Sequence, residues 1–174
     1  MKGQSDRVVR QIVIVGGGTA GWMTAAALAR KLSGTRANIR LIESAEIGTV
    51  GVGEATLPQI REFNRMLDID EADLMAQTSA TIKLGIEFRD WGKAGDHYVH
   101  PFGVHGEPIG PVDFHHHWVR ENARGRAEDF GSYCLAIEAA RHQRFDLPPE
   151  NPASLLHAYT YAFQFDASLY AAFL

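Results

Sequence analysis

The fold is decided by the stretch Ile12-Val13-Ile14-Val15-Gly16-Gly17-Gly18-Thr19-Ala20-Gly21-Trp22. Four apolar residues run into a glycine turn, after which a helical pattern begins. Gly16, Gly18 and Gly21 have the G-x-G-x-x-G spacing. This spacing allows a tight turn, a close approach of the backbone to a pyrophosphate, and close packing of the helix on the strand. The stretch therefore predicts the first strand, phosphate-binding turn and first helix of a nucleotide-binding βαβ unit.

The residues on either side of this stretch support the same interpretation. We expect the first strand over about Val8–Val15, and Ala25–Leu32 continues the helical pattern. A second, parallel strand is expected over Ile39–Glu43, and Glu43 lies 22 residues after Gly21. A carboxylate at about this spacing commonly binds a ribose hydroxyl of the nucleotide. A glycine turn in an α/β protein that binds no nucleotide is the alternative.

The composition indicates a globular chain with one sizeable core. The 174 residues are 45% hydrophobic and 22% charged, which suits a soluble domain. A net charge of −4 without a basic stripe argues against a nucleic-acid binder. A single cysteine excludes an internal disulfide, and the polar start lacks a secretory signal, so a cytoplasmic location is expected. The apolar runs stay below the roughly 20 residues of a membrane span, so membrane insertion is not expected.

A glycine-rich segment follows the second strand. In Ser44–Ala55 three glycines alternate with small β-branched residues, a pattern that can lie flat against a ligand. A mobile surface loop is the alternative, although its apolar residues suit solvent poorly. Thr56 begins an expected capping box for a helix that runs to about Leu67. Asp70 is expected to cap a short helix over about Glu71–Gln77.

The segment Ile82–Arg89 alternates apolar and polar residues with period two. This pattern predicts one continuous strand, in which Leu84 and Phe88 share a buried face with the isoleucines. Lys83 lies on the opposite, polar face. On propensity alone it is an ordinary exposed lysine.

The second half of the chain has weaker patterns. Trp91–Phe114 has no sustained period and is expected to be a long irregular segment, of the kind that often carries function. The run His115–His117 suggests a metal site, but adjacent residues of a strand point to opposite faces, so no metal is expected there. Helices are expected over Asp129–Arg144, where Cys134 is a buried apolar residue, and over Phe163–Leu174. An apolar helix that coincides with the end of the chain suggests a truncated polypeptide.

Taken together, these stretches resemble the N-terminal part of the flavin-dependent tryptophan halogenase family. The resemblance extends along nearly the whole chain, from the glycine turn to Phe165-Asp166-Ala167. It is most specific in the Gly-Val-Gly-Glu-Ala-Thr stretch at 51–56 and in the strand that contains Lys83. It implies an α/β, Rossmann-like FAD-binding (GxGxxG) fold of the flavin monooxygenase type. Residues 1–174 are then the N-terminal part of a single FAD-binding halogenase domain whose C-terminal remainder is absent.

The resemblance also implies a set of site residues. Lys83 matches the family's catalytic lysine, and His100 and Phe102 match side chains that pack on an aromatic substrate. No residue is assigned to a metal. The residues implied to bind FAD are Gly16, Gly18, Thr19, Ala20 and Gly21 near the pyrophosphate, Glu43 near the adenosine ribose, and Ser44, Ile47, Val50, Val52 and Ala55 in the segment 44–55, the family's strap beside the flavin.

The activity that the resemblance implies is halogenation of an aromatic, tryptophan- or indole-like substrate. FAD reduced by a separate flavin reductase, oxygen and a halide ion (chloride or bromide) give hypohalous acid. Lys83 then forms a haloamine or holds the hypohalous acid by a hydrogen bond. The partners implied are the flavin reductase and the small-molecule substrate, with no nucleic acid and no membrane, and a homodimer is allowed.

The sequence departs from the family in what it lacks. The W-x-W-x-I-P signature and the catalytic glutamate are not present in these residues, so a chain that ends at Leu174 is not expected to hold a complete active site. Two other functions stay open. One is a flavin monooxygenase or other FAD oxidoreductase, in which Lys83 is structural; the other is an inactive, truncated FAD-binding fragment.

Overall fold

The computed structural model describes residues 8–47, 53–149, 151 and 153–174. The chain divides into two compact units. The first comprises the described residues within Met1–Ala55, Gln59–Thr81 and Gln164–Leu174, and the second comprises those within Thr56–Pro58 and Ile82–Phe163. The chain thus passes from one unit to the other several times, and each unit is built from segments that are distant in sequence.

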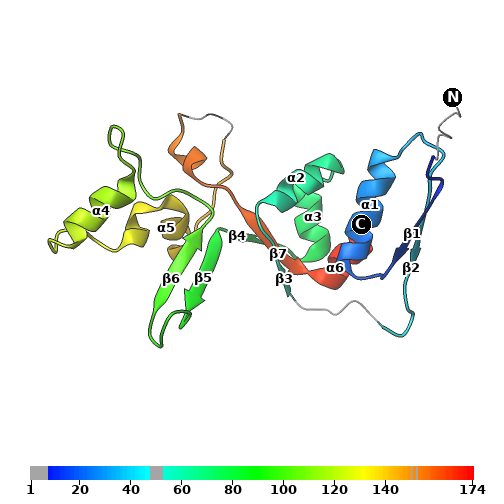
Figure 1. Cartoon of the computed structure of the whole chain (residues 1–174), viewed down its shortest axis with the longest axis horizontal. Coiled ribbons are helices and arrows are strands. Elements are labelled where there is room, and N and C mark those ends of the chain that lie inside the picture. The colour runs from blue at the N-terminus through cyan, green and yellow to red at the C-terminus, as the bar shows by residue number, and fades with distance from the viewer. Residues whose placement is uncertain (1–7, 48–52, 150, 152) are drawn as a thin grey trace, which may run out of the picture. The chain divides into compact units, whose positions relative to one another are not determined.

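The first unit begins with the expected βαβ arrangement. Strand β1 (Gln11–Val15) pairs in parallel with β2 (Asn38–Ile42), and helix α1 (Thr19–Lys31) connects them. Figure 1 shows α1 lying alongside this strand pair. The register runs from Gln11 opposite Asn38 to Val15 opposite Ile42. The predicted strand, turn, helix and parallel strand are therefore confirmed, with β1 starting at Gln11 because no strand pairing reaches Val8.

Three further helices and two strand segments complete the first unit. The helices are α2 (Gln59–Met66), α3 (Glu71–Thr78) and α6 (Ala167–Phe173). The short strand β3 (Gly53–Ala55) pairs antiparallel with β7 (Ala162–Asp166). The core side chains of this unit include Leu74, Phe165 and Tyr170, all buried. As predicted, Asp70 caps α3: its carboxylate accepts hydrogen bonds from the backbone N–H groups of Ala72 and Asp73.

Two predictions about helices were wrong. The helix expected from Thr56 begins only at Gln59, because the Thr56 hydroxyl bonds the backbone of Phe163 instead of capping a helix. The single helix expected over Phe163–Leu174 is strand β7 followed by α6. Its first residues are drawn into a strand because they pair with β3, a partner that local periodicity does not reveal.

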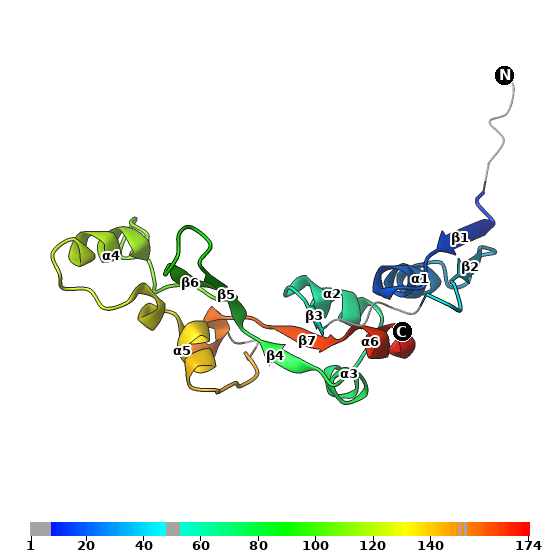
Figure 2. The same ribbon diagram turned by 90° about the horizontal axis from the view of Figure 1, so that it is seen from below.

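The second unit is organised around short strands. Strand β4 (Thr81–Lys83) belongs to a sheet of order β3-β7-β4, whereas β5 (Gly85–Arg89) and β6 (His97–Pro101) form a separate antiparallel hairpin. Figure 2 shows this hairpin from a second side. The one continuous strand expected over Ile82–Arg89 is therefore interrupted at Leu84, where the chain leaves one sheet and enters another. The prediction was wrong because two different partners divide the segment.

The remainder of the second unit is helical and irregular. Helix α4 (Phe114–Asn122) contains the histidine run, so the strand geometry used to argue against a metal site does not apply to it. The long helix expected over Asp129–Arg144 is a 3-10 turn (Phe130–Tyr133) followed by α5 (Leu135–Arg141), and a second 3-10 turn spans Leu155–Ala158. The predicted burial of Cys134, which lies between the first turn and α5, is confirmed at 1% exposure. Among the described residues, no helix has both the length and the apolar character needed to cross a bilayer.

Candidate functional site

The glycine turn between β1 and α1 has a geometry that requires glycine at two positions. Gly16 has a φ of +119°, a region that side-chain-bearing residues rarely adopt. A Cβ at Gly21 would lie 1.9 Å from the carbonyl oxygen of Gly16, so the start of α1 packs directly on the turn. Gly18 differs, because a Cβ there would meet no heavy atom within 4 Å. The turn is thus tightly closed on its inner side and open at Gly18.

The open side of the turn coincides with the N-terminus of α1. Gly18 is the N-cap, it provides no side chain to the helix end, and the first turn contains no acidic residue. By helix geometry, the backbone N–H groups of the first turn, which includes Thr19 and Ala20, lack intrahelical acceptors. These groups and the helix dipole favour an anion at this position. The arrangement therefore suits a phosphate group.

Glu43 lies beside this turn. A Cβ at Gly17 would be 1.9 Å from Oε2 of Glu43, so the carboxylate fills the space next to that glycine. After Glu43, the Ser44 hydroxyl accepts hydrogen bonds from the backbone N–H groups of Glu46 and Ile47 at 3.2 and 3.3 Å. This folds the first part of the strap into a turn and leaves Ile47 with 76% of its surface exposed.

The structure describes only one of the three other predicted strap residues. Ala55 is described and lies in β3 opposite Gln164. Val50 and Val52 lie outside the described residues.

Lys83 is the polar residue that the structure places most differently from expectation. It is only 9% exposed, although the strand pattern predicted an exposed side chain. Its Nζ donates a hydrogen bond to the backbone carbonyl oxygen of Thr56 at 2.8 Å, and it lies 5.5 Å from the ring centroid of Phe102. The prediction of an exposed lysine was wrong because the two residues that surround Lys83 come from other segments of the chain.

The environment of Lys83 has two opposing effects on its charge. A carbonyl acceptor and the face of an aromatic ring both stabilise the ammonium. Burial disfavours the charged form and lowers the pKa of Lys83 below its usual 10.5. In the part of the chain that the structure describes, no carboxylate forms an ion pair with Lys83. The lysine is therefore a nearly enclosed cation that has no counter-charge among the described residues.

The predicted substrate residues lie on either side of the end of β6. Phe102 is buried at 8% exposure, and its backbone N–H donates to the carbonyl oxygen of Leu84 at 2.8 Å. This bond brings Phe102 next to Lys83. His100 lies opposite Ile86 in the hairpin and is exposed. The structure thus joins Lys83 with Phe102 in the second unit and joins Glu43 with the glycine turn in the first.

Sequence reasoning missed the role of Thr56 at Lys83. Thr56 was interpreted as a helix cap, but its carbonyl oxygen accepts the lysine's hydrogen bond and its hydroxyl bonds the backbone of Phe163. Its position directly after the strap was the only available signal. That signal did not identify Phe163 as the partner, because the two residues are 107 positions apart.

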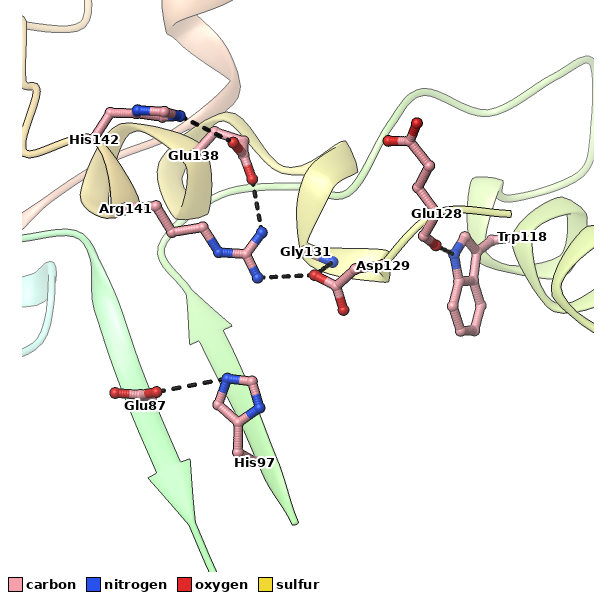
Figure 3. A network of polar contacts seen from close by, with 9 residues as sticks. All are labelled: Glu87, His97, Trp118, Glu128, Asp129, Gly131, Glu138, Arg141 and His142. Carbon is pink, nitrogen blue, oxygen red and sulfur yellow. Dashed lines mark hydrogen bonds and ion pairs between the residues drawn. The ribbon is translucent and has the colours of Figure 1, made fainter. Parts of the chain in front are cut away.

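A second polar cluster in the second unit is held together by exposed ion pairs (Figure 3). Arg141 bonds Asp129 at 2.8 Å and Glu138 at 2.7 Å, and His97 lies 3.6 Å from Glu87. The hydrogen bond from Arg141 lowers the pKa of Asp129. Exposed pairs of this kind contribute little to stability, because water screens the charges and long side chains lose freedom when they are held in one geometry. The cluster therefore ties α5 to the preceding 3-10 turn.

The histidines of α4 do not converge on a point. The rings of His115 and His116 lie close together, with 3.8 Å between their centroids, but successive residues of an α-helix are rotated by about 100°, which does not bring all three side chains to one side. Within the described ranges, no group of three or more His, Cys, Asp or Glu side chains has an arrangement that would hold a metal ion.

Comparison with known proteins gives a consistent result. The family model for tryptophan halogenase matches residues 11–174. Tryptophan 6-halogenase SttH from Streptomyces toxytricini is 40% identical over 94% of the chain and 34% of its own length. Among solved structures, the flavin-dependent halogenase Xcc4156 from Xanthomonas campestris has a TM-score of 0.83 at 50% identity, covering 96% of this chain and 32% of its own. The flavin-dependent halogenase BrvH from Brevundimonas sp. BAL3 has a TM-score of 0.85 at 41% identity, covering 97% and 33%.

These matches also define how much of the relatives is represented. The chain spans about a third of the length of the curated relatives it matches. Its α/β fold corresponds to the N-terminal portion of the solved flavin-dependent halogenases.

Proposed function

The chain belongs to the tryptophan halogenase family, and from this premise we propose that it supplies the FAD-binding turn and the catalytic lysine of a flavin-dependent halogenase. The substrate class proposed is an aromatic, tryptophan- or indole-like small molecule. The observation that carries the proposal is the match of the family model to residues 11–174. The glycine turn and the buried Lys83 support it independently of the match.

The residues of the glycine turn fit the pyrophosphate of FAD. The open space at Gly18 and the free amides at the start of α1 suit two linked phosphates, and a side chain at Gly18 would fill that space. We assign Gly16, Gly18, Thr19, Ala20 and Gly21 to this contact. Glu43, beside Gly17, is assigned to the adenosine ribose. Ser44, Ile47, Val50, Val52 and Ala55 are assigned to the strap beside the flavin.

Bound reduced FAD would supply, with oxygen, the oxidising equivalents that convert halide to hypohalous acid. The task of Lys83 is to hold the oxidised halogen next to the substrate. An ammonium has three protons, and among the described residues one is given to the Thr56 carbonyl oxygen; a second would bond the oxygen of hypohalous acid. The lowered pKa of Lys83 also increases the share of neutral amine, the form that becomes a haloamine.

Transfer of the halogen to the substrate ring needs no reagent beyond the hypohalous acid or the haloamine. A bond forms between the halogen and an aromatic carbon while the bond from the halogen to oxygen, or to the lysine nitrogen, breaks. With hypohalous acid, the ring proton and the hydroxide leave together as water. With the haloamine, the oxygen has already left as water when the nitrogen–halogen bond formed, and the ring proton restores the lysine amine. Phe102 and His100 are assigned to packing of the substrate ring, because Phe102 already contacts Lys83 and His100 lies two residues before it.

The proposal is tested by turnover of the natural polypeptide that carries this chain. The assay contains a flavin reductase, FAD, NADH, bromide or chloride, and tryptophan or indole, and mass spectrometry detects added halogen. We expect a product with halogen in place of one hydrogen. A product that gains oxygen alone would identify a monooxygenase. Flavin binding without any product would identify an FAD-binding fragment.

A further inference from the structure

Thr56 is joined to the backbone of Phe163 by three hydrogen bonds. The Thr56 backbone N–H donates to the carbonyl oxygen of Phe163 at 2.9 Å, and the Thr56 hydroxyl donates to the same oxygen at 2.8 Å. The hydroxyl also accepts from the Phe163 backbone N–H at 3.1 Å. Phe163 is fully buried. Thr56 is therefore fixed to a fully buried residue of the second unit through both its backbone and its side chain.

The carbonyl of this fixed residue is the hydrogen-bond acceptor of Lys83. The distance from Nζ to the Thr56 carbonyl oxygen is 2.8 Å. A lysine side chain has several rotatable bonds and loses rotamer entropy when it is held in one geometry. The other described contact of the ammonium is the ring of Phe102, which has no directional acceptor atom. The direction of Lys83 is therefore set by the carbonyl group of Thr56.

We propose that Thr56 is a positioning residue for Lys83, with its hydroxyl bonds to Phe163 holding the carbonyl that orients the ammonium. This inference rests on the proposed role of Lys83 in halogen transfer. In this role Thr56 acts through the lysine, whose hydrogen bond its carbonyl oxygen accepts. Because Thr56 directly follows the strap, the position of the lysine is linked to the end of the segment assigned to the flavin.

The test uses variants that change the hydroxyl and keep the shape of the residue. Thr56→Val removes both hydroxyl bonds to Phe163, and Thr56→Ser retains them. The control is Thr78→Val, because Thr78 is a buried threonine whose hydroxyl donates to the Leu74 carbonyl oxygen at 2.7 Å in the other unit. It shows the effect of losing a buried threonine hydroxyl bond that involves neither Thr56 nor Phe163.

The first measurement is the rate at which Lys83 is acylated, followed by mass spectrometry of its peptide across a range of pH. We expect Thr56→Val to label severalfold faster than the parent at each pH, because an unanchored amine reaches the reagent more often. Thr56→Ser and Thr78→Val should label like the parent. If Thr56→Val does not fold, Thr56→Cys replaces it, since a thiol is only a weak donor and acceptor. We then expect Lys83 to be acylated faster in Thr56→Cys than in the parent, Thr56→Ser or Thr78→Val.

The second measurement is halogenated product per oxygen consumed. A small displacement of a reacting group lowers a rate by about tenfold or more, so we expect a loss of this size in Thr56→Val and recovery in Thr56→Ser. Oxygen consumption should stay at the parent rate. The inference would be overturned if Lys83 in Thr56→Val were acylated at the parent rate, or if Thr78→Val accelerated acylation equally. It would also be overturned if Thr56→Ser were acylated as fast as Thr56→Val. A parent that never halogenates would refute the proposed function alone, because the labelling order is measured independently of turnover.

Discussion

Replacing Lys83 with methionine should destabilise the protein as well as stop halogen transfer. Methionine has a similar length and fits an apolar site, so the change removes the ammonium with little change of shape. It leaves the carbonyl oxygen of Thr56 without its donor and the ring of Phe102 without its cation. An exposed lysine, as the strand pattern predicted, would leave stability almost unchanged.

The magnitude follows from the contacts of the buried ammonium. Loss of a hydrogen bond from a charged donor costs about 1.5–3 kcal/mol, and loss of a cation–π contact costs about 0.5–2 kcal/mol. Methionine avoids the desolvation of a buried charge, which offsets part of this loss. The lowered pKa of Lys83 indicates that desolvation outweighs the charge-dependent part of these contacts. We therefore expect the free energy of unfolding to fall by about 1 kcal/mol at neutral pH, which is the contribution of an ordinary hydrogen bond. Halogenated product should disappear, while FAD binding and oxygen consumption continue.

The stability difference between the parent and Lys83→Met should depend on pH. The pKa of Lys83 in the folded protein is lowered from its usual 10.5 by burial, so above the lowered pKa the unfolded chain binds more protons than the folded protein. Folding is therefore favoured as pH rises through the window between the lowered pKa and 10.5. The advantage of the parent over Lys83→Met should grow across this window and stay level below it.

The assay is chemical denaturation followed by tryptophan fluorescence, since Trp91 and Trp118 belong to the same unit as Lys83. The matched control is Lys93→Met, because the Lys93 side chain is 81% exposed and 3.9 Å from Asp96. We expect the control to change stability by less than about 0.5 kcal/mol. Equal stability of parent and Lys83→Met at every pH would refute the reasoning from burial. Product formation by Lys83→Met at the parent level would remove Lys83 from the mechanism.

Three other substitutions test the turn and the first unit. Gly18→Val should abolish FAD retention on gel filtration yet fold, because the backbone angles of Gly18 suit any residue and its surroundings are open; retained flavin would contradict the phosphate assignment. Tyr170→Phe should lower the free energy of unfolding by about 1–3 kcal/mol, because its hydroxyl donates to Oδ1 of Asn64, a buried amide whose Nδ2 already lacks a partner among the described residues. Asp70→Ala should cost about 1 kcal/mol in urea denaturation through the lost cap of α3, and Asp70→Asn should restore most of it.

The sequence by itself determined the features whose causes are local. The apolar run of β1, the glycine spacing and the acid after β2 predicted a βαβ start, and the parallel pairing confirms it. Asp70 was predictable as a cap because its carboxylate bonds groups only two and three residues ahead. In each case the interacting groups are neighbours along the chain, so residue type and spacing were sufficient.

Only the tertiary structure decided the environment of Lys83. The alternation of apolar and polar residues predicts an exposed lysine if one face of the strand meets solvent. In the structure, however, the strand ends at Lys83 and the next strand joins a different sheet. The acceptor of the lysine lies 27 residues earlier, and the residue that fixes this acceptor lies 107 residues after it. Such pairings depend on how distant segments come together. Local patterns do not contain that information, and the burial of a single cation therefore became visible only in the folded chain.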